Sequence, residues 1–375
     1  MTRRVAAVVV AAGLLATLPG ELRGAPPVFL RIVGAGETRV GLNAAASAFW
    51  WTNGVPDTAY RVETASSLAA NARWYPVDVY HATGSVVTVD GVSPDPALRT
   101  ALVPGGTFQM GDALGDGYAS EQPVHPVTLS PFYVDRFEVT WAHWVSVRSW
   151  ATNNGYAFDG AGNAVDAVYP VVAVSWHDCV KWCNARSEVE GREPVYYTSA
   201  AQTGVYRTGR LNLAPGDVRW SATGWRLPTE AEWECAARGG AVGRRFPWSD
   251  TNTISHARAN YRSRASDAFD MSGAAGFHPL FASNASPVGA FAPNAYGLYD
   301  VAGNAWEWCW DWYDPAYYGS SPAENPRGPA GGADRVARGD SYYNHAFYAR
   351  CAYRNYWAPT NRFEDFGLRC VRRAP

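Results

Sequence analysis

The sequence predicts an α+β protein of low regular secondary structure, preceded by a small β domain. The chain of 375 residues contains 17 Trp and 21 Tyr together with 36 Gly and 25 Pro. Gly and Pro interrupt regular elements, and large aromatic side chains fill the core that remains. The pattern also changes near residue 100, from short alternating runs to segments with both strand and helix signals. Length alone suggests about two domains.

The charge balance gives no sign of a nucleic-acid partner. The net charge is −2, and 18% of the residues are charged. A nucleic-acid-binding chain usually carries a marked excess of Lys and Arg. We therefore expect no nucleic-acid binding.

The first 25 residues are predicted to be a cleaved secretory signal peptide. Arg3 and Arg4 precede an apolar run over residues 5–18, which is too short to span a bilayer, and small residues follow near Ala25. An uncleaved anchor is the alternative. Because no later stretch is apolar enough for a membrane span, we expect a secreted or periplasmic protein.

Residues 26–98 are predicted to form a small β-sandwich-like domain. The runs VFLRIV, TAYRVETA, RWYPVDVYHA and SVVTVDG alternate apolar and polar residues and are separated by turn residues. The phrasing at Tyr60–Glu63 and Trp74–Val77 resembles fibronectin-type modules of exported bacterial proteins. We expect a spacer or packing role here, and a binding module is the alternative.

Residues 99–375 open with strands and then carry clear helix signals. Ala101–Asp112 predicts two strands around a Gly-Gly turn. A helix is predicted after an N-cap at Ser175, and a second after Thr229, which is followed three residues later by the Glu of a capping box. Gly239 is predicted to end the second helix. Beyond it the chain predicts mostly turns and short strands.

The densest aromatic stretch is Tyr296–Tyr313, with the sequence YGLYDVAGNAWEWCWDWY. Aromatic side chains at this density indicate a core segment. The same stretch carries Asp300, Gly303 and Glu307. A turn that offers carboxylates and backbone carbonyls suits a hard cation such as calcium. The alternative is a Trp-rich core segment in which Glu307 is solvated.

Eight segments between residues 101 and 373 resemble, in order, the sulfatase-modifying-factor family, which includes the formylglycine-generating enzymes. They are VPGGTFQMGD, PVHPVTLSPFYVDRFEVT, PVVAVSWHDCVKWCN, GWRLPTEAEWECAARGG, FPWSD, NAYGLYDVAGNAWEWCWDWY, DRVARGDSYY and FGLRC. The resemblance implies a formylglycine-generating-enzyme-like fold over residues 99–375. This fold is related to C-type lectins and is low in regular secondary structure.

The resemblance also implies where a copper site would lie. In members that oxidise a sulfatase cysteine to formylglycine, a cysteine pair shortly after a Gly-Gly-Ser motif binds copper(I), a soft ion that prefers thiolates. The matching stretch here, Gly339–Arg354, is a few residues shorter. Asn344 falls at the first cysteine position, and no cysteine is present from His345 to Phe347, where the second would fall. We therefore expect no copper and predict no catalytic residue.

The resemblance further implies a structural calcium site within the aromatic stretch. Asp300 and Glu307 would supply side-chain oxygens, and Gly303 and Ala305 would supply backbone carbonyls. Asp300 stands where the enzymes carry Asn, which adds negative charge.

A second calcium site is implied at Asn260 and Tyr261. Its remaining carboxylate would come from Asp267 or Asp270, two candidates that the resemblance does not separate. Calcium is thus the one cofactor that we expect.

Six cysteines in an exported chain suggest disulfides, although their spacing alone leaves fifteen complete pairings open. They are Cys179, Cys183, Cys235, Cys309, Cys351 and Cys370. The resemblance implies a Cys183–Cys370 disulfide and allows a Cys235–Cys351 disulfide. The other two cysteines either pair with each other or stay as buried thiols.

Three functions remain open from the sequence. The missing cysteine pair favours a non-catalytic or divergent member, a binding or scaffold protein whose aromatic cleft accepts an exported protein, a peptide or a glycan. The alternatives are a formylglycine-generating oxidase that acts on sulfatase cysteines and another metal- or oxygen-dependent oxidoreductase. His345 is the histidine nearest to the expected pocket.

Overall fold

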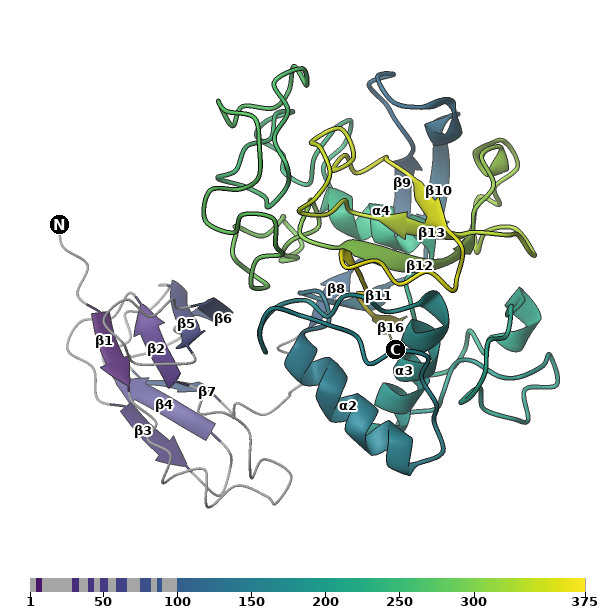
Figure 1. Ribbon diagram of the computed structural model, residues 1–375, viewed down its shortest axis with the longest axis horizontal. Helices are drawn as coiled ribbons and strands as arrows, with labels where there is room; N and C mark the ends of the chain where they lie inside the picture. The colour runs from purple at the N-terminus through teal and green to yellow at the C-terminus, as the bar shows by residue number, and fades with distance from the viewer. Residues whose placement is uncertain are drawn as a thin grey trace. The chain divides into compact units, whose positions relative to one another are not determined.

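The computed structural model divides the chain into two compact units, Met1–Arg99 and Thr100–Pro375. It describes residues 100–374 without interruption and, before them, only the backbone of strands β1 to β7 (Figure 1). These strands are β1 (Val5–Val8), β2 (Phe29–Val33), β3 (Val40–Asn43), β4 (Ala48–Thr52), β5 (Ala59–Ala65), β6 (Tyr75–His81) and β7 (Val86–Val89).

The strands of the first unit form two antiparallel sheets. The four-stranded sheet has the order β1-β2-β5-β6, and the three-stranded sheet has the order β3-β4-β7. Strands β2, β5, β6 and β7 coincide with the alternating runs in the sequence. Strand β1 lies within the predicted signal peptide and pairs with β2. The rest of that segment lies outside the described residues, so the signal peptide stays a prediction.

The second unit contains three small sheets. Strands β8, β11 and β16 form one in the order β16-β11-β8, β9 and β10 form a hairpin, and the last has the order β14-β13-β12-β15. The strands are β8 (Thr100–Val103), β9 (Gly106–Met110), β10 (His125–Leu129), β11 (Phe132–Asp135), β12 (Trp306–Trp312), β13 (Arg335–Arg338), β14 (Asn355–Trp357), β15 (Phe366–Gly367) and β16 (Val371–Arg373).

The three α-helices of this unit begin at residues with capping chemistry. The α-helices are α2 (Trp141–Asn153), α3 (Trp176–Val189) and α4 (Glu230–Arg238), and the 3₁₀ turns are η3 (Ala119–Glu121), η4 (Pro215–Asp217) and η5 (Tyr317–Gly319). The Ser175 side chain accepts a hydrogen bond at the start of α3, as predicted. Thr229 and Glu232 form the predicted capping box of α4, and Gly239 ends it with a φ of 56°.

Strand β12 lies between α4 on one side and α2 and α3 on the other (Figure 1). All seven of its residues are buried. Trp306, Trp308 and Trp310 belong to the core cluster that α2 and α3 help to form. Because side chains alternate across a strand, Glu307, Cys309 and Asp311 face α4. Two of those are acidic, so the α4 side must provide them with polar partners.

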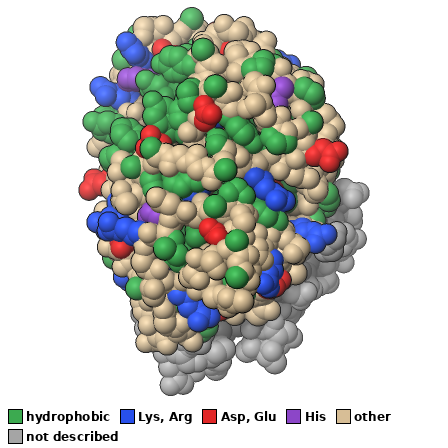
Figure 2. All heavy atoms as spheres, turned by 90° about the vertical axis from the view of Figure 1, so that its right-hand side faces the viewer, with side chains coloured by type: hydrophobic (Ala, Val, Ile, Leu, Met, Phe, Trp, Pro, Cys, Tyr) green, Lys and Arg blue, Asp and Glu red, His purple; other side chains and the backbone are tan. Residues whose placement is uncertain are grey.

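One face of the second unit shows no dominant surface charge, and the described helices include none that could span a membrane. On the face in Figure 2, positive and negative side chains are scattered among hydrophobic ones, with no continuous basic stripe. No helix in the described part of the chain is long and apolar enough to cross a membrane.

Candidate functional site

The loop between β13 and β14 contains the residues that match the copper-site position. Ser341 anchors the start of this loop, because its hydroxyl donates to Asp365 over 2.7 Å and accepts from the Asn344 side chain over 2.9 Å. The Asn344 carbonyl accepts from the backbone N–H of Arg262 over 2.9 Å. Asn344 is therefore held on both its side chain and its backbone.

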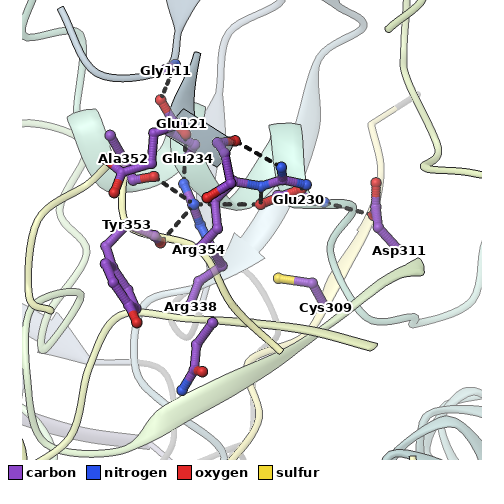
Figure 3. A network of polar contacts seen from close by, with 12 residues as sticks. Gly111, Glu121, Glu230, Glu234, Cys309, Asp311, Arg338, Ala352, Tyr353 and Arg354 are labelled. Atoms are coloured by element: carbon purple, nitrogen blue, oxygen red, sulfur yellow. Dashed lines mark hydrogen bonds and ion pairs between the residues drawn. The ribbon is translucent and has the colours of Figure 1, made fainter. Parts of the chain in front are cut away.

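The far end of the loop is fixed by two buried arginines (Figure 3). The Arg338 guanidinium donates to the carbonyls of Cys351, Ala352 and Tyr353 over 2.6, 3.0 and 2.6 Å. It also forms an ion pair with Glu234 on α4, at 2.5 Å. Cys351 is thereby held as part of the framework, and its side chain lies in a core cluster.

Arg354, the last residue of the loop before β14, continues this network (Figure 3). Its guanidinium binds both carboxylate oxygens of Glu230, at 2.7 and 2.8 Å. The backbone N–H of Glu230 in turn donates to Asp311 on β12 over 2.7 Å. These contacts join the loop, α4 and β12 through buried charges that each have a partner.

The donor atoms at the copper position do not fit copper(I). Asn344 and His345 offer amide and imidazole groups, whereas copper(I) prefers thiolates. The described loop from Gly339 to Arg350 contains no cysteine. The residues present therefore do not reproduce the two-thiolate site of the oxidising enzymes.

Asp340 is an unexpected feature of this loop. It has a left-handed backbone with a φ of 73°, and its side chain is fully buried. Neither of its carboxylate oxygens has a hydrogen-bond partner among the described residues. Burial raises the pKa of this carboxyl well above its usual value, and the charge of Asp365 raises it further. The sequence signal was Asp in place of the second Gly of a Gly-Gly-Ser motif.

The predicted calcium ligands Asp300 and Glu307 are both buried. One Asp300 oxygen accepts from the Gly289 N–H over 2.5 Å, while the other has no partner in the part of the chain that the structure describes. Burial raises the pKa of Asp300 to about 7, and the negative charge of Glu307 contributes. An unpartnered buried carboxylate oxygen is what a hard cation would bind.

Glu307 itself already has two partners. It accepts from Arg369 over 2.8 Å and from the indole N–H of Trp233 over 2.7 Å. Its alternative description as a solvated residue is therefore wrong. Glu138 is a third buried carboxylate in this group, and sequence reasoning missed it. Burial and the charges of Asp300 and Glu307 raise the pKa of Glu138. Three buried carboxyls therefore surround one guanidinium, that of Arg369.

The residues of the two predicted calcium sites meet in space. A Cβ atom at Gly303 would lie 2.3 Å from the carbonyl oxygen of Asn260, so only glycine fits there. The backbone N–H of Asn304 donates to that same carbonyl over 2.8 Å. The side-chain oxygen of Asn260 is buried without a partner among the described residues. The two sets of predicted calcium ligands are therefore neighbours in the fold.

Around Tyr261 the structure separates the two candidate carboxylates. The Tyr261 hydroxyl donates to Asp270 over 2.6 Å, and Asp270 also accepts from two backbone N–H groups. Asp267 keeps one buried oxygen without a partner in the described part of the chain. No group of three or more His, Cys, Asp and Glu side chains gathers there with the geometry of a metal site. Any cation would need backbone or amide oxygens as well.

A pocket of about 550 Å³ opens beside the same loop. Its lining combines two arginines and a histidine with small residues: Arg262, Ser263, Arg264, Ala275, Gly276 and His345. No carboxylate belongs to this lining. The structure therefore places His345, the histidine singled out from the sequence, at the edge of a basic pocket.

All six cysteines are buried. The sulfur atoms of Cys183 and Cys370 lie 3.6 Å apart, which is contact distance rather than a bond. Cys235 and Cys351 share a core cluster. Both disulfides therefore stay predictions, with the first supported by proximity.

The chain is similar in sequence to a known protein family and to several of its members. Residues 90–374 match the model of the sulfatase-modifying factor enzyme 1-like domain. The formylglycine-generating enzyme of Streptomyces coelicolor is 35% identical over 318 residues, which cover 74% of this chain and 92% of that protein. The enzyme of Bos taurus is 33% identical over 310 residues, covering 76% and 77%.

A solved structure supports the same fold. Treponema denticola variable protein 1 superposes with a TM-score of 0.56 at 30% identity, over 73% of this chain and 95% of that one. The predicted α+β, formylglycine-generating-enzyme-like fold is thereby confirmed.

Proposed function

Because this chain belongs to the sulfatase-modifying factor enzyme 1-like domain family, we propose that it is a divergent member that binds a peptide instead of oxidising it. The observation that carries the proposal is the donor set in the loop after β13. Asn344 and His345 stand there, and the nearest cysteine along the chain, Cys351, is held in the framework by Arg338.

The test is a conversion assay on the full chain. A Cys-x-Pro-x-Arg peptide is incubated with the protein, copper(I) and oxygen, and mass spectrometry follows the peptide. We expect no change in mass. A lighter peptide, in which the cysteine has lost its sulfur and gained an oxygen to become formylglycine, would overturn the proposal. The same reaction with a formylglycine-generating enzyme serves as the positive control.

We also propose that calcium is held by Asp300 and Glu307 together with the carbonyls of Gly303 and Ala305. Asn260 and Tyr261 would supply a neighbouring site. The unpartnered oxygen of Asp300 and the presence of three buried carboxyls beside the single guanidinium of Arg369 support this proposal. Bound calcium would neutralise that charge and fix the turn before β12.

Secretion or export to the periplasm is part of the same proposal. An exported protein would meet both calcium and an oxidising environment, which the predicted disulfides require. N-terminal sequencing of the mature protein tests it. A mature chain that starts near Ala25 would support export, and an intact Met1 in cytoplasmic fractions would oppose it.

A further inference from the structure

The pocket beside the site loop is built by three chain segments that are fixed to one another. Arg262 pairs with His345 through a parallel bridge, and Ser263 pairs with Gly276 through an antiparallel bridge. The Ser263–Gly276 pair exchanges two backbone hydrogen bonds, of 2.7 and 2.9 Å. The walls are therefore formed before any ligand arrives, which limits the entropy lost on binding.

The two arginines of the pocket are free to bind an anion. In residues 100–374, neither Arg262 nor Arg264 has a carboxylate within ion-pair distance, although Asp267 and Asp270 follow them closely in the sequence. Asp270 accepts from the Tyr261 hydroxyl and from the backbone N–H of Arg264. Two guanidinium groups that form no ion pair within residues 100–374 match a carboxylate through paired N–H donors.

Two aromatic residues, Phe277 and Tyr343, lie close in the sequence to residues that line the pocket. The Arg262 guanidinium lies 5.2 Å from the centre of the Phe277 ring, and Phe277 contacts Tyr343 with ring centres 5.9 Å apart. Tyr343 is 54% exposed. Exposed Tyr beside Arg is the composition typical of strong contacts in protein and peptide interfaces. A volume of about 550 Å³ is in the range that accepts a small ligand or a few side chains.

We propose that this pocket is the docking site for an acidic peptide segment. An Asp or Glu carboxylate of the peptide is bound by Arg262 and Arg264, and an adjacent side chain packs on Tyr343. This inference rests on the proposed peptide-binding function and names its ligand class. It also distinguishes this protein from an enzyme for Cys-x-Pro-x-Arg peptides, because a ligand arginine would be repelled by the two guanidinium groups.

The test measures the binding of fluorescent peptides to the full chain by anisotropy. A Glu-rich peptide is compared with Gln-rich and Lys-rich peptides of the same length, at low and high salt. We expect the Glu-rich peptide to bind best and to weaken as salt rises. Equal binding of the Glu-rich and Gln-rich peptides would overturn the proposal.

Variants locate the binding. Arg262→Gln and Arg264→Gln should each weaken binding of the Glu-rich peptide about tenfold or more, since each removes a charge-assisted contact. Arg258→Gln is the matched control, because Arg258 is also on the surface but pairs with Asp250 outside the pocket. Unchanged binding in both pocket variants, or equal loss in the control, would place the ligand elsewhere and refute the proposal.

Two further results separate this inference from the proposed function. If a sulfated oligosaccharide binds in an Arg262-dependent way and the Glu-rich peptide does not, the peptide assignment is wrong. If no acidic ligand binds while the Cys-x-Pro-x-Arg peptide stays unconverted, the proposed docking site is refuted and the proposed non-oxidising function is supported. Conversion of that peptide would instead refute the proposed function.

Discussion

At the scale of single residues, Asp340 is the most costly feature of the site loop. Its φ of 73° is one that side-chain-bearing residues rarely adopt, and its buried carboxylate has no partner among the described residues. A buried polar group without a hydrogen bond normally destabilises a fold. The pKa of Asp340 is raised in the folded state. Asp340 therefore opposes folding most at pH values where its carboxyl is ionised in the unfolded chain.

Replacing this carboxylate should therefore stabilise the protein at neutral pH. Asp340→Asn keeps the shape and tolerates a positive φ, and it should raise the free energy of unfolding by about 1–3 kcal/mol at pH 7. Above about pH 4 the unfolded carboxyl loses its proton while the folded one keeps it, so the parent loses stability as pH rises. The advantage of the variant should grow from pH 4 to pH 7 in urea unfolding. An advantage that is constant with pH would show that the charge is not the cause.

Asp300 allows a direct test of calcium. Chelation should lower the melting temperature of the parent. At a free calcium concentration about 100 times the dissociation constant, binding adds roughly 2.7 kcal/mol to the free energy of unfolding. Asp300→Ala should lose this response, and Asp300→Asn, which keeps an oxygen, should retain part of it. Glu307→Gln is a poorer test, since Glu307 also binds Arg369.

The raised pKa of Asp300 gives calcium binding a pH dependence. With that pKa at about 7, protons compete with calcium, so affinity measured by titration calorimetry should fall from pH 8 to pH 6. Equal melting temperatures of the parent with and without chelator would mean that no stabilising calcium site exists.

At the scale of elements, the strongest local signals in the sequence were predictive. The caps of α3 and α4 were identified correctly, because cap chemistry depends on residues a few positions apart. The partners of Glu307 were not predicted. Arg369 and Trp233 are far from it along the chain, and only the folded packing brings them together. The two unpartnered carboxylate oxygens of Asp340 were not predicted for the same reason.

Helix α3 carries the best-supported disulfide prediction. Cys183 and Cys370 are 187 residues apart in the chain, and their sulfur atoms are in contact. If they form a disulfide, Cys183→Ser should destabilise the second unit by about 2–5 kcal/mol. Dithiothreitol should lower the melting temperature of the parent and leave that of the variant unchanged. Two free thiols in non-reducing peptide mapping of secreted protein would contradict the pairing.

At the scale of the second unit, buried ion pairs join elements from distant parts of the sequence. Arg338 on β13 binds Glu234 on α4 and also caps three carbonyls of the site loop. Such pairs do not by themselves add much stability. Removal of Arg338 takes one of two guanidinium partners from the buried Glu234, which keeps Arg238, and leaves three carbonyls without this donor. The family pattern located the loop, and this network could not be read from spacing.

Loss of Arg338 should therefore be severe. Arg338→Met should lower the free energy of unfolding by about 3–5 kcal/mol, because Glu234 and three carbonyls lose a partner. Arg210→Gln, which removes an exposed ion pair with Asp159, is the control and should change the urea midpoint very little. Similar midpoints for the two variants would show that the network does not support the fold.

The same fixed ends have a consequence for how this loop can change over generations. Ser341 anchors its first residues, and the carbonyls bound by Arg338 anchor its last. A loop with fixed ends can lose or gain residues at an entropic cost that varies slowly with its length. The scaffold should therefore tolerate deletions within this loop without refolding the rest of the unit. A rigid framework of this kind leaves the sequence of the loop free to diverge.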